Sequence, residues 1–187
     1  MKKQDFGERA ASRRARKRAR QSGSTITELA LIMTPMMALL LAIVELSLPI
    51  FKKSTFMSAV REGTRYGITY QTSYNGTTYG TQTRAIQAVV QANAMGFLDG
   101  DTNLALIRVQ YFQPTSPFTE VTGTASANQD GNVIQVSVQG YTHNWMVPVM
   151  WFWGRTNFSV TGTNLTIAAS SADRLETLPG GAARPAP

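Results

Sequence analysis

The feature that most constrains this chain is a long apolar run close to its N-terminus. Residues 29–51 are apolar except for a few polar positions, chiefly Thr34 and Glu45. A helix needs roughly 20 such residues to cross the hydrocarbon core of a bilayer. The sequence therefore predicts one membrane-spanning helix over about 29–51. Kinks are expected at Pro35 and Pro49, because each proline removes one backbone hydrogen bond.

The positive charge of the chain is confined to a short leader before this run. The net charge is +7. The first 22 residues contain nine Lys or Arg residues against Asp5 and Glu8, whereas nine basic residues balance nine acidic ones in the rest of the chain. A general nucleic-acid-binding surface is therefore not indicated. Since the basic residues mark the cytoplasmic side, we expect a cytoplasmic N-terminus and an exported C-terminal part.

Other export signals explain this region less well. The apolar run is too long for a cleaved signal peptide, and no small-residue cleavage site follows it. Arg13 and Arg14 form a twin-arginine pair, but no apolar segment follows at the distance that this pathway requires. An uncleaved signal anchor accounts for the charge and the length, and it stays open as an alternative.

Four short motifs add a family resemblance. A basic leader followed by Gly23, with Glu28 five residues further on, resembles the cleavage site of a type IV prepilin. Residues 28–31 (ELAL) and 43–46 (IVEL) are similar to the start and the middle of the N-terminal helix in the TadE-like family, the minor pseudopilins of tight-adherence (Flp) pilus systems. Residues 61–67 (REGTRYG) resemble the signature that ends this helix.

The resemblance implies a processing site and an assembly contact. A prepilin peptidase would cut between Gly23 and Ser24 on the cytoplasmic side. Glu28 would then pair with the new α-ammonium of Ser24, either of a neighbouring subunit or of its own chain. Four residues separate the two groups, so they share one helix face. The simpler alternative is that Glu28 is solvated in the headgroup layer, where a negative charge suits the start of a helix.

Two further parts of the helix have competing interpretations. Glu45 is expected near the outer interface, as an exposed acid close to Lys52 and Lys53 or as a contact to another subunit. The helix-end signature, favoured as a solvated helix end, comprises Arg61, Glu62, Gly63, Arg65 and Tyr66.

The remaining sequence predicts a small exported domain. Apolar residues from Arg84 to Leu98 recur at helical spacing, and the polar stretch 69–83 before them reads as a loop. Alternating patterns predict strands near 107–112, 134–139 and 157–168, with a β-bulge around Gly162. Asp130-Gly131 is a hairpin signal, which makes Phe118–Ser126 the expected partner strand. The predicted fold class is α+β, with a long helix and a second helix packed on a three- to four-stranded antiparallel sheet.

Three C-terminal features complete the predicted organisation. Residues 145–153 (WMVPVMWFW) either cap the core of the sheet or form an apolar interface patch. His143, the single histidine, is expected in a loop or cap rather than in a metal site. The predicted parts are a leader (1–23), the long helix (24–67), the exported domain (68–169) and a mobile tail (170–187). The members of the apolar patch are Trp145, Met146, Val149, Trp151, Phe152 and Trp153.

These features favour a structural subunit over an enzyme. The chain has no cysteine, and its sequence shows neither a phosphate-binding glycine loop nor a catalytic constellation, so we expect no cofactor and no metal. The resemblance implies a minor pilin in the bacterial inner membrane, with a prepilin peptidase, other pilins and the assembly platform as partners and with roles in adhesion or secretion. The alternative is an uncleaved, single-pass anchored module whose exported domain recognises a ligand or a surface.

Overall fold

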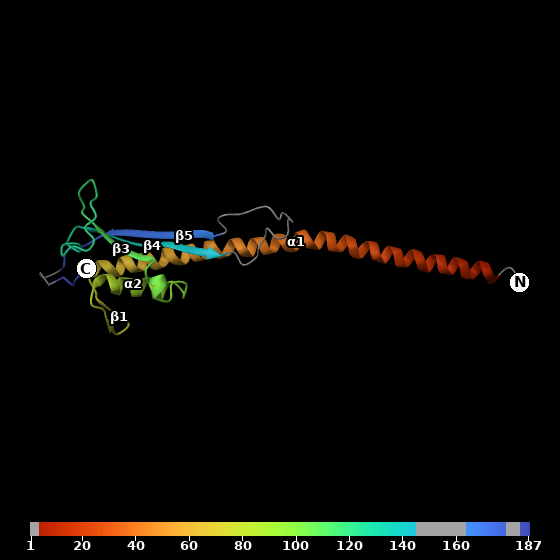
Figure 1. The fold of residues 1–187 in the computed structure, drawn as a ribbon, viewed down its shortest axis with the longest axis horizontal. Helices are drawn as coiled ribbons and strands as arrows, with labels where there is room; N and C mark the ends of the chain where they lie inside the picture. Colours follow the sequence, from red (N-terminus) through yellow and green to blue (C-terminus); the bar gives the residue numbers. More distant parts are fainter. Residues whose placement is uncertain (1–3, 145–163, 179–183) are drawn as a thin grey trace. The chain divides into compact units, whose positions relative to one another are not determined.

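The computed structural model describes the backbone of residues 4–144, 164–178 and 184–187, and side chains in these ranges from Thr25 onward (Figure 1). The described chain divides into two compact units, the first ending at Glu45 and the second beginning at Leu46. A long helix, shorter helices and antiparallel strands follow one another along the chain. The predicted α+β class is confirmed.

The long helix α1 spans Gln4–Ile68. It includes the basic leader as well as the predicted segment 24–67, and it is assigned as helix without a break through Pro35 and Pro49. The hydroxyl of Thr34 donates to the carbonyl oxygen of Ala30 at 2.8 Å, so the polar group in this apolar stretch is satisfied within the helix.

The second unit is built on residues 46–68 of α1, which we call the domain half of the helix. Phe56, Ala59 and Val60 have no exposed surface, and Gly63 and Gly67 are buried on the same side. Their spacing of three and four residues is that of a single helix face. Strands β3, β4 and β5 run along the domain half in Figure 1, and this apolar face joins the core that they help to form.

Helix α2 (Gln82–Asn93) confirms the second predicted helix. The hydroxyl of Thr81 accepts from the backbone N–H of Arg84 at 3.3 Å and thereby caps the start of α2. Met95 and Gly96 follow it with positive φ angles of 53° and 80°, which end the helical path. The residues of α2 that face the core are Gln82, Ala85, Ile86, Val89 and Val90.

The main sheet has three antiparallel strands in the order β3-β4-β5. They span Ile107–Phe112, Val133–Asn144 and Asn164–Arg174. Alternate residues of β3 face the core, and the pairs Ile107↔Val138 and Tyr111↔Ile134 fix the register with β4. The alternation in the sequence thus predicts both the strands and their buried faces.

Two shorter elements complete the unit. Helix α3 spans Asp101–Leu104, and the small hairpin of β1 (Ser73–Tyr74) and β2 (Thr77–Thr78) lies in the stretch expected to be a loop. Asn75 and Gly76 connect the two strands with φ angles of 49° and 77°. This is the left-handed turn that Asn-Gly favours in a hairpin, a signal already present in the sequence.

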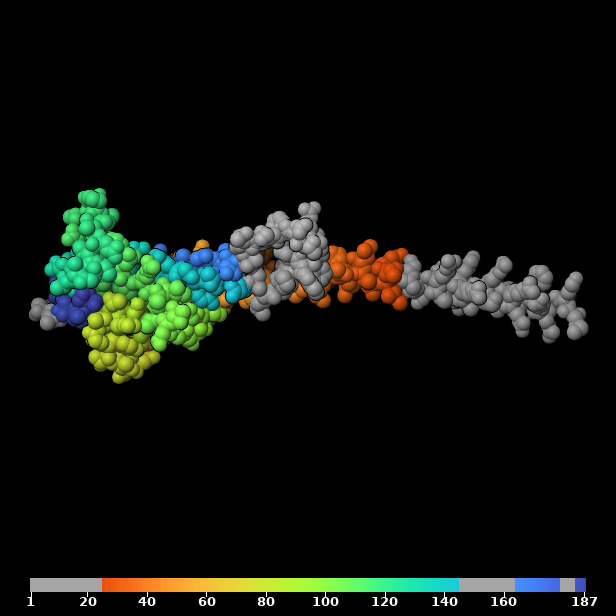
Figure 2. All heavy atoms as spheres, viewed as in Figure 1, coloured from red at the N-terminus to blue at the C-terminus, as the bar shows by residue number. Residues whose placement is uncertain are grey.

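The expected strand Phe118–Ser126 is wrong. The segment forms turns and one isolated bridge, Phe112↔Glu120, and β4 pairs with β3 and β5 instead. Figure 2 shows residues near 115–120 as a blue-green projection from the domain. Phe118 is 65% exposed and Val121 is only partly buried against the core, so the segment has no fully buried apolar side chain to hold it as a regular strand.

A β-bulge lies on β4, in addition to the predicted position on the last strand. The register of β4 and β5 shifts between Val138 and Tyr141, where β4 carries one extra residue. Gly140, at φ 78°, adopts the left-handed conformation that such a bulge requires. Residues 157–163, with the predicted position around Gly162, are outside the described residues.

The predicted start of the tail at Ser170 is wrong. Strand β5 continues to Arg174, and Ser170 pairs with Ser137 of β4. Leu175 is then 2% exposed within the core. The polar and small residues of this stretch carry no apolar alternation, so only their backbone pairing with β4 identifies them as a strand.

Candidate processing and assembly segment

Gly23 and Ser24, the expected cleavage residues, lie on α1 between the basic leader and the apolar run. Glu28 follows Ser24 by four residues, which corresponds to a rise of about 6 Å along a helix. The side chain of Glu28 is exposed. A carboxylate at this position therefore lies on the helix surface, on the face where an α-ammonium at Ser24 would arise after cleavage.

The helix surface after Glu28 is apolar on all sides. Leu29, Leu31 and Ile32 are 60%, 76% and 64% exposed, and Leu39 and Ile43 are similarly exposed at 60% and 57%. The orange stretch in Figure 2 is this surface. Residues 25–68 contain a window whose mean hydropathy of 2.3 and length suffice for a membrane span. An apolar surface of this extent is typical of single-pass anchoring in a membrane.

Glu45 is not the exposed interfacial acid that the sequence favoured. Its side chain is 3% exposed. It lies on the same helix face as the buried Pro49 and Phe56, four and eleven residues further along.

Lys52 connects the domain half of α1 to strand β4. Its ammonium lies 3.3 Å from the hydroxyl of Tyr141 and 3.2 Å from Nδ1 of His143, and it is 5.2 Å from the ring centroids of Phe97 and Tyr141. A lysine ammonium only donates, so Nδ1 of His143 is the acceptor in this contact. His143 is a buried strand residue, 3% exposed, and not the expected loop or cap residue.

The helix-end signature divides into an exposed and a buried set. Arg61, Glu62 and Arg65 are exposed, and Arg65 Nη1 lies 3.8 Å from Glu62 Oε2. An ion pair this exposed contributes little stability. These charged residues agree with a solvated helix end.

The glycines of the signature are packing positions. A Cβ atom on Gly63 would overlap with Cγ2 of Val90, and one on Gly67 would lie 2.6 Å from Cδ1 of Ile134. Both contacts are closer than real Cβ atoms approach. The two glycines, one helical turn apart, thus allow α2 and β4 to approach the backbone of α1.

Tyr66, which precedes Gly67 in the signature, contacts the small hairpin of β1 and β2. Its hydroxyl donates to the carbonyl oxygen of Ser73 at 2.7 Å, and its ring meets Tyr74 edge to face at 6.1 Å. Burial raises the pKa of Tyr66, and the nearby Tyr79 adds to the increase. The phenol is therefore neutral and available as a donor at physiological pH.

The apolar patch of Trp145, Met146, Val149, Trp151, Phe152 and Trp153 lies outside the described residues. Its two interpretations, a cap of the core or an interface, stay predictions. In the described part of the chain, no group of three or more His, Asp or Glu side chains is arranged to hold a metal ion.

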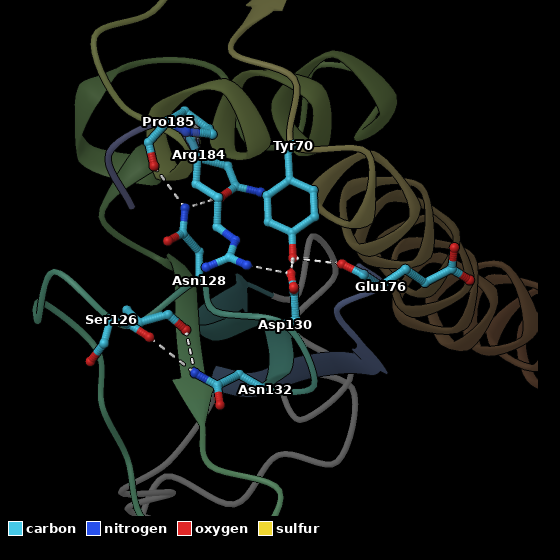
Figure 3. Close-up of polar contacts among 10 residues, drawn as sticks. Tyr70, Ser126, Asn128, Asp130, Asn132, Glu176, Arg184 and Pro185 are labelled. Atoms are coloured by element: carbon cyan, nitrogen blue, oxygen red, sulfur yellow. Dashed lines mark hydrogen bonds and ion pairs between the residues drawn. The ribbon is translucent and has the colours of Figure 1, made fainter. Parts of the chain in front are cut away.

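Sequence reasoning missed a polar site at the start of α2. Gln82, 0% exposed, and Asn128, 2% exposed, are hydrogen-bonded to one another at 3.1 Å. The backbone N–H of Gln82 also donates to the carbonyl oxygen of Ala186, and Asn128 donates to that of Pro185, as Figure 3 shows for Asn128. A glutamine beside a helix cap reads as a surface residue, and Asn128 lies 46 positions away. The sequence pattern holds no signal that these two side chains meet.

Comparison with known families bears on the N-terminal segment. Residues 23–65, about a quarter of the chain, match the family described as TadE-like protein, which confirms the resemblance. No curated protein and no solved structure gives a match. The match indicates a pilus-associated, minor pilin-like protein, and that family is structural rather than enzymatic.

Proposed function

We propose that this chain is a minor pilin or pseudopilin, a structural subunit of a tight-adherence (Flp) type IV pilus or a related secretion apparatus. In this proposal a prepilin peptidase removes residues 1–23 at the cytoplasmic face of the inner membrane. The mature subunit then packs against other pilins and the assembly platform through its N-terminal helix, with its α+β domain exported. The observation that carries the proposal is the family match over residues 23–65, which includes the cleavage glycine and most of the helix-end signature.

The structure of the matched segment supports a packing role. Its first part presents apolar side chains on every side, so that lipid or the helices of other subunits can cover them. Its last part belongs to the core of the exported domain. A subunit that packs through its helix needs both properties, since the exposed part has to meet partners and the buried part has to hold the domain.

Glu28 supports the same role. A charged side chain costs about 2.5–3.5 kcal/mol at the centre of a bilayer on insertion scales, and less near the interface. An α-ammonium on Ser24 of a neighbouring subunit would offset this cost. In the proposal Glu28 therefore selects a register between adjacent helices, and its partner exists only after cleavage.

The cleavage step is tested by co-expression with the matching prepilin peptidase and measurement of the intact mass. We expect a mature chain that begins at Ser24. Replacing Gly23 by valine should block the cut, because a branched side chain then occupies the scissile position. An unchanged mass of the unsubstituted chain, in a sample where a known prepilin is processed, would contradict the proposal.

The assembly role of Glu28 is tested separately. Glu28→Ala should leave cleavage largely intact and reduce incorporation into filaments, as measured by immunoblotting of sheared pili. Glu120→Ala, which removes an exposed carboxylate from the domain, is the matched control and should incorporate normally. Normal incorporation of Glu28→Ala would remove the charge-pairing role.

One observation favours the alternative, an uncleaved anchored module that binds a ligand. A cavity of about 610 Å³ opens beside α2, and its lining includes Arg84, Gln87, Asp101 and Tyr111. A cavity of this size falls within the range of small-molecule sites. Retention of the leader in cells that contain an active prepilin peptidase would favour this function over the pilin.

A further inference from the structure

The C-terminal segment Arg184–Pro187 lies in a defined polar site at the start of α2 (Figure 3). Arg184 Nη2 is 2.7 Å from Asp130 Oδ1. The next two carbonyl oxygens each accept one hydrogen bond. That of Pro185 accepts from Asn128 Nδ2 at 2.8 Å, and that of Ala186 accepts from the backbone N–H of Gln82 at 2.8 Å.

The residues of this site are held in place by the rest of the domain. Gln82 Nε2 donates to the carbonyl oxygen of Gly67 at 2.6 Å, and Gln82 Oε1 accepts from Asn128 Nδ2 at 3.1 Å. The hydroxyl of Tyr70 lies 3.5 Å from Asp130 Oδ1 and donates to the carbonyl oxygen of Glu176 at 2.9 Å. Gln82 and Asn128 are thus positioned by buried hydrogen bonds within the domain, and Asp130 lies beside the part-buried hydroxyl of Tyr70.

The loop that carries Asn128 and Asp130 is fixed in the same way. Asn132 Nδ2 donates to the carbonyl oxygens of Ser126 and Ala127 at 3.1 and 2.9 Å. Asn132 is 7% exposed, so these bonds are shielded from water. The side chains of Asn128 and Asp130 therefore project from a closed, internally bonded loop.

The site requires an acceptor-rich partner. Gln82 is the first residue of α2, and the N–H groups of a first helical turn have no acceptor within the helix. Gln82 and Asn128 are buried, so leaving their donors without an acceptor would be unfavourable. A segment with proline on both sides of Ala186 suits this need, since proline offers a carbonyl oxygen but no N–H.

The segment itself contributes no apolar side chain to the core. The side chains of the Arg184–Asp130 pair are 33% and 32% exposed, and the residues of the segment are exposed or only partly buried. None of them belongs to the buried core. Its attachment therefore depends on polar contacts alone, a partly exposed ion pair and two carbonyl oxygens that accept from the buried residues Gln82 and Asn128, and any second copy of the segment can supply the same groups.

We propose that this site binds an extended Arg-Pro-X-Pro segment and exchanges its own copy for that of a second copy of this chain. Exchange of an identical element between protomers creates no new chemistry and keeps every contact of the site. The chain's own segment is present at its site at an effective concentration of roughly millimolar. The segment of a neighbouring subunit reaches a similar local concentration when subunits are packed in a membrane or filament. The exchange thus rests on the proposed function as an assembling subunit.

A charge-swap experiment in the full chain tests the exchange. Asp130→Arg and Arg184→Asp each place like charges together within one chain. In a mixture, Arg184 of the Asp130→Arg variant can pair with Asp130 of the Arg184→Asp variant. The introduced Asp at position 184 can likewise pair with the introduced Arg at position 130. Each chain carries Ala186→p-benzoylphenylalanine as a photo-cross-linker, and one variant is labelled with ¹⁵N. The two are reconstituted in phosphatidylethanolamine–phosphatidylglycerol vesicles.

We expect cross-links between labelled and unlabelled chains in the mixture, mapped by mass spectrometry to the region of Gln82 and Asn128 and several-fold more abundant than in either variant alone. Arg61→Asp, an exposed charge reversal on α1, is the control and should behave like the unsubstituted chain. A mixture no richer in such cross-links than the separate variants would overturn the exchange.

The double variant Asp130→Arg with Arg184→Asp separates loss of fold from loss of recognition. Its reversed ion pair should restore cross-linking at Gln82 and Asn128 to the level of the unsubstituted chain. Failure to restore it would overturn the assignment of Asp130 as the recognition group for Arg184. The leader is retained throughout, so a failure of prepilin cleavage would not affect either result.

Discussion

The two halves of α1 have the same backbone structure but opposite surroundings. Between Ile26 and Val44 the large apolar side chains are exposed on all sides of the helix, whereas between Phe56 and Gly67 one face is buried and the other is polar. A helix that is apolar all round needs an external apolar partner, and a helix with one apolar face can satisfy it within its own domain. One continuous helix therefore exposes an apolar surface along its first half and packs into its own domain along its second half.

The largest expected effect tests the buried face of the domain half by a core truncation. Phe56→Ala should lower the free energy of unfolding of the exported domain by about 3–5 kcal/mol. Phe56 is fully buried, and its ring lies 4.9 Å from that of Tyr141. Phe51→Ala is the matched control and should cost about 1 kcal/mol, because Phe51 is 50% exposed. Urea unfolding in detergent measures both, and equal effects would contradict the assignment of the buried face.

A charge introduced into the apolar half should act on insertion instead. Leu39→Arg places a guanidinium near the middle of the apolar run and should disfavour insertion by about 2.5–3.5 kcal/mol. Ser58→Arg, on the exposed face of the domain half, should leave insertion unchanged. The fraction resistant to alkaline extraction from membranes reports the difference. If Leu39→Arg inserted as efficiently as the unsubstituted chain, the membrane-spanning role of residues 29–51 would fail.

A smaller effect is expected where α1 meets α2. Gly63→Ala should destabilise the domain by about 1–3 kcal/mol, since the new methyl group overlaps with Val90. Gly80→Ala is the control, because a Cβ there meets no atom within 4 Å. Combining Gly63→Ala with Val90→Ala should recover part of the loss if the overlap is its cause. Thermal unfolding measures the three variants. If the loss of stability in the double variant equalled the sum of the losses in the two single variants, the overlap would not be the cause.

The smallest expected effect is a pH dependence of the stability of the domain, which has no counterpart in the apolar half of α1. Burial raises the pKa of Tyr111 to about 12, compared with 10.0 for an unperturbed tyrosine. The neutral phenol is favoured in the folded state. The contribution of Tyr111 to the free energy of unfolding is therefore complete below pH 10 and is lost as the pH rises through about 12. At pH 11 the free energy of unfolding should be lower by about 1.4 kcal/mol, which corresponds to one pKa unit.

Tyr111→Phe is the control for this titration. The unsubstituted chain should lose more stability between pH 9 and pH 11 than the variant, when both are followed by urea unfolding. The absorbance of tyrosinate at 295 nm should show one group fewer titrating at the highest pH in the variant. Identical pH dependence of the two chains would exclude Tyr111 as the source.

The sequence predicted the regular elements because their patterns are local. The apolar run, the helical stripe through Ile86 and Val90 and the alternation in 107–112 each report burial within a few residues. The partner of β4 was not predictable in this way, since the Asp130-Gly131 turn fits any neighbouring strand. The backbone pairing of Ser170 with Ser137, and the burial of Glu45, depend on residues that the local pattern does not include.

Composition and periodicity alone predict an apolar helix, a basic leader and an α+β domain, because these patterns report burial over a few residues. The glycine–glutamate motif rests on the family resemblance instead. Contacts in the folded domain show that Gly63 and Gly67 are packing positions and that Gln82, Asn128 and Asp130 form one site around Arg184. Contacts of this kind join residues far apart in the chain, and the folded core alone brings them within hydrogen-bonding distance.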